Sequence, residues 1–421
     1  MYPPNVLSLT PTDALDRVPT SQQLFGERFT NPGCVSCDCD VHRNIYTAHR
    51  VLKYFQMSEI HTVEAAYHPK NKMGFLIDWL LTLKCNYDCT YCPVGPTGHD
   101  NSKAHPPTEK CMTMLRQMYE YTDAVMQYKK NSFKDAVLNV YGGEALYHPD
   151  IENILIGSSR EYEKYAHRWR LRRRLTTNAT ATSKKWHTVC EHIEGITFSY
   201  HAQGPDKLKT FFKNNIEHAV KQKIEHDIII CMYPHERYWQ DCMDFLRYCE
   251  VNKLNARPKL LDGSEGVYSE SQLKQLMPYL KNFDEADIKK IDKSTRIADQ
   301  TRGCCGGRAM CMNRDIKNYV SMMPRDLGFK GWHCSANQFF LSGNNVSGEY
   351  HTNKDCKVRL DSTSGPIATI DTMDEYITAM KQKDKLPTMV CVQERCICGT
   401  CAPKSVYKES LDDILRIYNS Q

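Results

Sequence analysis

The chain has 421 residues, of which 41% are hydrophobic and 25% are charged. Such proportions are ordinary for a globular protein, and they exclude a largely disordered chain. The length allows one large domain and a smaller second one. The formal net charge of +5 is too small to indicate a nucleic-acid or membrane partner. The most apolar stretch, residues 74–83, contains Asp78 and is too short to cross a bilayer, so we expect no membrane partner.

Cysteine is unusually abundant, with 20 residues that lie in tight groups. The amino terminus opens on a polar stretch and lacks the basic start and apolar run of a secretory signal. We therefore expect a cytoplasmic protein whose cysteines stay reduced. In a reducing cytosol, clustered cysteines are more often metal ligands than disulfides.

Residues 1–70 show little alternation, and we expect an irregular amino-terminal extension there. From residue 71 to 265, short apolar runs alternate with segments of helical period, which is typical of βα units. The expected strands are residues 75–83, 136–141, 173–177, 195–200, 227–232 and 256–261. The expected helices are residues 108–130, 150–166, 182–193, 206–223 and 236–252.

Six strands with five intervening helices predict an α/β fold, a partial (β/α)6 TIM-like barrel with a parallel sheet and right-handed crossovers. An active site would then lie at the carboxyl ends of the strands. We expect a helical linker over residues 266–300. Residues 301–421 are rich in glycine and cysteine, and they predict a small metal-stapled carboxyl-terminal domain.

A Cys-x3-Cys-x2-Cys group, formed by Cys85, Cys89 and Cys92, stands at the end of the first expected strand. Three thiolates this close can hold a cubane iron-sulfur cluster and leave one iron open to an outside ligand. A zinc knuckle with His99 as its fourth ligand is the alternative. The spacing and the position after a strand favour the cluster.

This spacing resembles the radical S-adenosylmethionine (SAM) superfamily, and the resemblance implies that SAM binds the open iron of a [4Fe-4S] cluster. The second expected strand ends in Gly142, Gly143 and Glu144, similar to the family's Gly-Gly-Glu motif that receives the amino end of SAM. Glycines let a backbone approach a ligand closely, and a carboxylate complements an ammonium group. Many members have proline where this chain has Ala145.

Polar residues also end the next two expected strands. Thr177 and Asn178 suit a ribose or a carboxylate, and the resemblance implies that they bind SAM. Ser199 and His201 are similar to the Ser-x-His of peptide-modifying members, and His201 is either a SAM contact or a catalytic base. Tyr91 resembles the family position whose backbone touches adenine.

A second resemblance begins after residue 300, where the cysteine pattern is similar to the SPASM and twitch extensions that hold auxiliary [4Fe-4S] clusters. It implies a cysteine-rich iron-sulfur domain with one or two such clusters. The implied ligands are Cys334, Cys356, Cys396, Cys398 and Cys401. A structural zinc site is the alternative. The roles of seven further cysteines stay open: Cys34, Cys37, Cys39, Cys304, Cys305, Cys311 and Cys391.

Two other patterns have simpler interpretations. Cysteines in or beside the expected elements are interpreted as small apolar residues: Cys111, Cys190, Cys231, Cys242 and Cys249. Residues 168–174 combine five arginines with Trp169, a mixture that can hold RNA. Arginines that enter a barrel strand usually form a solvated surface, so we do not expect a nucleic-acid partner.

The resemblance implies a radical SAM enzyme that cleaves SAM reductively to a 5′-deoxyadenosyl radical, which abstracts hydrogen from a substrate. By analogy, a peptide or protein side chain is the favoured substrate. An electron donor such as a flavodoxin or ferredoxin is also implied. Two alternatives stay open: a tRNA-modifying radical SAM enzyme and, from another class, a non-catalytic zinc-binding interaction module.

Overall fold

The structure is a computed structural model. It describes residues 62–63, 75–92, 104–128, 134–261, 268–279, 330–352, 364–383 and 385–392, with residues 356, 358–359, 404–405, 408, 411–412 and 415–416. Several predictions lie outside the described residues. They concern most of residues 1–70, most of the linker, His99, Cys34, Cys37, Cys39, Cys304, Cys305, Cys311, Cys396, Cys398 and Cys401.

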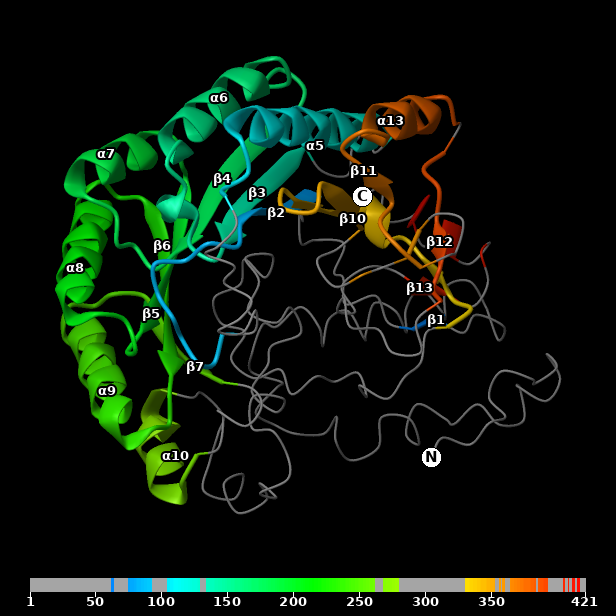
Figure 1. The fold of residues 1–421 in the computed structure, drawn as a ribbon. Helices are drawn as coiled ribbons and strands as arrows, with labels where there is room; N and C mark the ends of the chain where they lie inside the picture. Colours follow the sequence, from blue (N-terminus) through cyan, green and yellow to red (C-terminus); the bar gives the residue numbers. More distant parts are fainter. Residues whose placement is uncertain are drawn as a thin grey trace, which may run out of the picture.

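Within the described residues, one curved sheet of nine strands has the order β11-β10-β9-β2-β3-β4-β5-β6-β7 (Figure 1). Its central six strands pair in parallel and follow the order of the chain. They are β2 (Phe75–Thr82), β3 (Asp135–Gly142), β4 (Arg170–Thr177), β5 (Gly195–His201), β6 (Glu225–Met232) and β7 (Ala256–Leu260). The expected α/β architecture, a partial barrel, is thereby confirmed.

Five helices connect these strands and cover the convex side of the sheet (Figure 1). They are α5 (Thr108–Tyr128), α6 (Ile151–Glu163), α7 (Ser183–Glu191), α8 (Asp206–Lys221) and α9 (Glu236–Val251). Each lies within its expected range. α8 and α9 are each followed by a lysine with positive φ, Lys223 at 56° and Lys253 at 53°, a backbone conformation that ends a helix.

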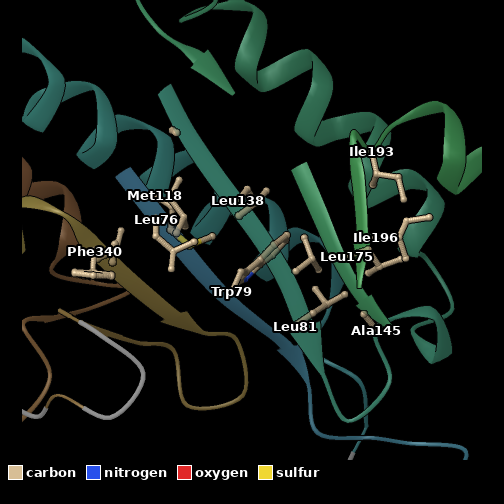
Figure 2. Packing of buried hydrophobic residues seen from close by; sticks show 14 of the residues in the cluster. Leu76, Trp79, Leu81, Met118, Leu138, Ala145, Leu175, Ile193, Ile196 and Phe340 are labelled. Carbon is tan, nitrogen blue, oxygen red and sulfur yellow. The ribbon is translucent and has the colours of Figure 1, made fainter. Parts of the chain in front are cut away.

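The core lies between the sheet and these helices. Leu138, Leu175 and Ile196 come from three neighbouring strands and are fully buried, as is Met118 of α5 (Figure 2). Burying such side chains contributes roughly 1.5–3 kcal/mol each. This packing holds the strand ends, and therefore the site, in fixed relative positions.

Three further strands extend the sheet beyond β2, which the sequence analysis did not anticipate. β9 (Phe340–Asn344) pairs in parallel with β2, and β10 (Glu349–His351) and β11 (Ala368–Thr369) follow it antiparallel. Thus part of the predicted carboxyl-terminal domain continues the barrel sheet. β9 is short and contains Ser342, Gly343 and Asn344, so it lacks the apolar alternation that marks a strand.

The remaining described elements are small. A four-stranded sheet of two-residue strands contains β1 (Thr62–Val63), β13 (Lys404–Ser405), β8 (His333–Cys334) and β12 (Met389–Val390). α13 (Met373–Lys381) reaches α5 through an ion pair between Asp374 and Arg116 at 2.8 Å. α10 (Glu270–Leu276) is the described helix of the expected linker. Among the described helices, none is both long and apolar enough to cross a membrane.

Candidate functional site

Residues 83–92, the cysteine loop, follow β2 at the carboxyl ends of the parallel strands. Cys85 and Cys89 are buried in it, and Cys92 is half-buried. The N–H of Cys92 donates to the carbonyl oxygen of Cys89 at 3.1 Å. Burial is the main cause that raises the pKa of Cys85 to about 12, and the charges of Glu144, Cys89 and Cys92 add to it. The loop therefore gathers the three thiols near one carboxylate.

The three thiols of this loop are a donor set that fits an iron-sulfur cluster, and His99, the fourth ligand of the zinc alternative, lies outside the described residues. In the described part of the chain, no three His, Cys, Asp or Glu side chains come close enough to hold one ion. A zinc knuckle requires four ligands that converge on one point. Cubane thiolates each bind a different iron, so Cys85, Cys89 and Cys92 need no common point. Their assignment as cluster ligands stays a prediction.

Gly142 and Gly143 bring the end of β3 against the start of the cysteine loop. The N–H of Gly143 donates to the carbonyl oxygen of Thr82, and that of Glu144 donates to the carbonyl oxygen of Lys84, both at 2.8 Å. A Cβ atom on either glycine would collide with one of these two carbonyl oxygens. Because these glycines have no side chain, the backbone at the start of the cysteine loop can approach the end of β3. This contact fixes Glu144 beside the cysteine loop.

Glu144 is 2% exposed and is held from three sides. Its Oε1 accepts hydrogen bonds from the Leu146 N–H (2.9 Å) and the Thr177 hydroxyl (2.6 Å), and its Oε2 accepts one from the Asn178 N–H (2.6 Å). Burial raises the pKa of Glu144, although these bonds lower it. A carboxylate has about four acceptor positions, so one position is left for a further donor.

Asn86, Asn178 and Thr180 form a closed ring of hydrogen bonds, which we call the asparagine ring. Asn86 donates to Thr180 (2.7 Å), Thr180 donates to Asn178 (2.7 Å), and Asn178 donates to Asn86 (2.9 Å). Between them, Ala179 has φ of 51°, and its carbonyl oxygen accepts from the buried Asn215 at 2.8 Å. The loop after β4 is therefore built to meet the cysteine loop.

The second half of the cysteine loop meets the end of β5. His201 lies with Nε2 2.9 Å from the Ser199 hydroxyl and Nδ1 2.9 Å from the Tyr91 hydroxyl. The rings of Tyr91 and His201 are stacked, with centroids 5.8 Å apart. The N–H of Thr90 donates to Gln203 at 2.9 Å. The structure thus brings three of the predicted SAM-binding residues together.

Cys231 is buried, as expected of a small apolar residue, but it also lies beside two predicted site residues, Ser199 and His201. In the strand register it lies between His201 and Lys259, and its Sγ lies 3.9 Å from the hydroxyl of Ser199. Burial raises the pKa of this thiol, but the charge and hydrogen bond of His201, together with Lys259, bring it down to about 7. Its position near the end of β6 was the available signal. Cys111, Cys242 and Cys249 are buried, as interpreted.

No family model matches the sequence, and no curated protein is significantly similar to it. Solved structures of anSMEcpe share 14% identity with this chain. The native protein with bound AdoMet and Cp18Cys peptide has a TM-score of 0.41, over 73% of this chain and 80% of that chain. With the Kp18Cys peptide, the score is 0.39 over 82% and 99%. A histidine-tagged form with bound AdoMet scores 0.34 over 50% and 58%.

With TM-scores below 0.5, these likenesses are weak. They add nothing to the fold and the site that the chain's own geometry shows.

The concave side of the sheet carries a polar row in register across its strands. Asp78, Asn139, Arg174, Gly195 and Glu225 are cross-strand neighbours in this order. Asn139 donates to Asp78 at 3.0 Å, and Arg174 donates to Glu225 at 2.8 Å. A Cβ on Gly195 would lie 2.9 Å from the Arg174 guanidinium, so the glycine leaves room for it. Charged side chains thus line the barrel below the site.

The basic run at residues 168–174 is neutralised within the protein. The ion pairs are Arg168–Asp123, Arg170–Asp135, Arg172–Glu225, Arg173–Glu194 and Arg174–Glu225. Trp169 and Arg174 are also buried. The expectation of a solvated surface is therefore wrong for Arg174, because β4 directs its side chain into the protein.

Three of the carboxyl-terminal cysteines fall within the described residues, and all three are buried: Cys334, Cys356 and Cys391. Cys334 pairs with Met389 across β8 and β12. The N–H of Cys391 donates to the carbonyl oxygen of Trp332 at 2.8 Å, which continues this pairing. Cys334 and Cys391 therefore lie on neighbouring chain segments. The role of Cys334 and Cys356 as auxiliary-cluster ligands stays a prediction, and the role of Cys391 stays open.

Proposed function

We propose that this chain is a radical SAM enzyme, in which Cys85, Cys89 and Cys92 hold a [4Fe-4S] cluster. The observation that carries the proposal is the convergence of the cysteine loop with Glu144. Two backbone hydrogen bonds of 2.8 Å lock the end of β3 to the residues just before Cys85. A carboxylate fixed this close to three thiols suits a ligand that binds both a cluster and a carboxylate.

Cys85, Cys89 and Cys92 would hold the cluster, which would supply the one-electron reduction of SAM to methionine and a hydrogen-abstracting 5′-deoxyadenosyl radical. The chain's own residues bind SAM and orient it. Glu144 offers its remaining acceptor position to the SAM ammonium group. Thr177 and Asn178 hold Glu144 in place, and Ser199, His201 and Tyr91 bound the opposite side of the site.

For the substrate, we propose a peptide or protein side chain. The Ser199 and His201 pair, which resembles that of peptide-modifying members, is ordered by a hydrogen bond of 2.9 Å. His201 also lies beside Cys231, so it can move a proton at the rim of the barrel. We further propose that Cys334 and Cys356, with Cys396, Cys398 and Cys401, hold one or two auxiliary clusters.

The two alternatives have less support. The arginines of residues 168–174 are the feature that suggests a nucleic-acid substrate, and all five are in ion pairs. If the chain were a zinc-binding module, the position of Glu144 next to the cysteine loop would have no explanation. Replacing Arg172 and Arg173 should leave any weak RNA binding and its salt dependence unchanged.

The proposed function is tested by anaerobic reconstitution with iron and sulfide, followed by incubation with SAM and a reductant. The proposal expects a [4Fe-4S] cluster and the release of 5′-deoxyadenosine. Absence of both would refute it.

A further inference from the structure

A group of cations lies on the outer side of the cysteine loop, next to Cys85. Lys84 directly precedes this cysteine and is half-buried. Lys185, at the start of α7, donates to the carbonyl oxygens of Leu146 and His148, both at 3.3 Å. These bonds hold its ammonium group against the turn that follows Glu144.

Histidines join the two lysines. The ring of His105 lies 5.0 Å from that of His148, and its Nδ1 lies 3.2 Å from the hydroxyl of Thr82. Burial, then the charges of His148, Lys84 and Lys185, lower the pKa of His105 to about 4. The main charges that act on His105 are therefore positive.

This group has little countercharge in the described part of the chain. No ion pair is formed there by Lys84 or Lys185, in contrast to the arginines of β4. Two carboxylates lie nearby: Glu144, which is buried, and Asp150, which acts on His148 and accepts a hydrogen bond from Thr108. Lys184, which precedes Lys185, is exposed, so lysines outnumber carboxylates among the described residues of this group.

Tyr147 adds an exposed aromatic ring to this surface. It is 48% exposed, and its ring lies 5.6 Å from that of His105. Tyrosine is enriched among the residues that form protein interfaces. We call the surface formed by Lys84, Tyr147, Lys184 and Lys185 the lysine face.

We propose that the lysine face docks an acidic one-electron carrier protein, of the flavodoxin or ferredoxin class. This inference rests on the proposed function. The lysines of the lysine face form no ion pair with the described residues, so they complement an acidic partner. Complementary charge speeds association and fixes orientation. Lys84 adjoins Cys85, so a carrier bound here is next to a ligand of the cluster that needs the electron. One electron passes from the reduced carrier to the cluster, and no bond is made or broken.

The experiment compares two ways of reducing the reconstituted holoenzyme. SAM cleavage is driven either by dithionite or by a reduced acidic flavodoxin, at 50 mM and at 300 mM salt. The readout is the ratio of the flavodoxin-driven rate to the dithionite-driven rate. Binding of oxidised flavodoxin, followed by calorimetry, gives a second readout that does not depend on turnover.

The variants reverse charge on the lysine face. We expect Lys184→Glu combined with Lys185→Glu to lower the ratio at 50 mM salt about tenfold, as a loss of about 1.4 kcal/mol in docking implies. Flavodoxin binding should weaken equally, and 300 mM salt should weaken it in the wild type. Lys84→Glu should act in the same way. Lys221→Glu, at the far end of α8, is the control and should keep the wild-type ratio.

The outcomes separate the two proposals. If wild-type holoenzyme fails to cleave SAM with dithionite, the proposed function itself fails. If it cleaves SAM and the variants keep the wild-type ratio and affinity, the docking inference is overturned. An acidic substrate or a second copy of the chain on the lysine face would give this second result.

Discussion

Asn178 connects the two halves of the site, because its side chain donates to Asn86 at 2.9 Å while its backbone N–H donates to Glu144 at 2.6 Å. One residue at the end of β4 thus fixes both the cysteine loop and the carboxylate. We therefore expect the side chains of the asparagine ring, as well as the proposed cluster, to position the cysteine loop.

Opening the asparagine ring should weaken SAM binding. Asn86→Ala removes one donor and one acceptor, and Asn178 and Thr180 each lose a partner. Such a loss costs about 1–1.5 kcal/mol, so we expect SAM to bind roughly tenfold more weakly to the reconstituted enzyme. The change in the EPR spectrum of the reduced cluster on SAM titration measures this. Thr180→Ser keeps the hydroxyl and is the control. Unchanged SAM affinity in Asn86→Ala would remove this role from the ring.

The close approach of β3 to the cysteine loop predicts a strong effect of a single methyl group. In Gly143→Ala, the new Cβ would meet the carbonyl oxygens of Leu83 and Lys84, which are backbone atoms that cannot move aside cheaply. We expect a loss of about 2–3 kcal/mol in unfolding free energy, typical of overpacking, and poor cluster incorporation. Gly157→Ala is the matched control, because its Cβ meets the flexible end of Met112. Equal urea midpoints for the two variants would contradict the prediction.

The ion pair between Arg174 and Glu225 should matter more than the exposed pair between Arg170 and Asp135. The Arg174 side chain is 8% exposed, whereas that of Arg170 is 78% exposed. Breaking a buried pair costs several kcal/mol, but Glu225 keeps Arg172, so we expect Arg174→Leu to lose about 2 kcal/mol. Arg170→Leu should lose less than about 1 kcal/mol. Thermal unfolding of both variants tests this order, and the reverse order would refute it.

His105 predicts a dependence of stability on pH. Its pKa falls from 6.5 to about 4 on folding, chiefly through burial and then through nearby positive charges. Between these values the unfolded chain binds a proton that the folded chain does not, so stability should fall as the pH drops from about 6.5 to about 4. Because His105 is partly exposed, the slope should stay well below about 1.4 kcal/mol per pH unit. His105→Gln should flatten it in urea unfolding at pH 4.5 and 7.5. An equally steep loss in this variant would assign the effect to other groups.

The sequence predicts the barrel well, because its strands are buried apolar runs separated by amphipathic helices. Residues 75–83 and 227–232 illustrate this: both are mostly apolar, and Asp78 and Asp227 are their only charged residues. β9 escaped prediction because Ser342, Gly343 and Asn344 carry no apolar period, and its place is fixed by pairing with β2, 264 residues away in the Leu76–Phe340 pair.

The site was predicted in part. Cys85, Glu144 and Asn178 follow strands and His201 ends one, so their motifs and positions mark them in the sequence. The asparagine ring could not be foreseen, because Asn86 and Thr180 meet only through the tertiary fold. The arginine pairs of β4 also depend on strand register, which composition does not reveal.

The most direct test of the central claim compares the wild type with a variant that carries Cys85→Ala, Cys89→Ala and Cys92→Ala. Both are reconstituted anaerobically with iron and sulfide and are given SAM and dithionite. We expect the wild type to release 5′-deoxyadenosine and its reduced cluster to change EPR spectrum on SAM addition. The variant should lose both signals while it keeps any iron bound by the carboxyl-terminal cysteines. Cleavage of SAM by the variant, or none by the wild type with a full cluster, would contradict the account.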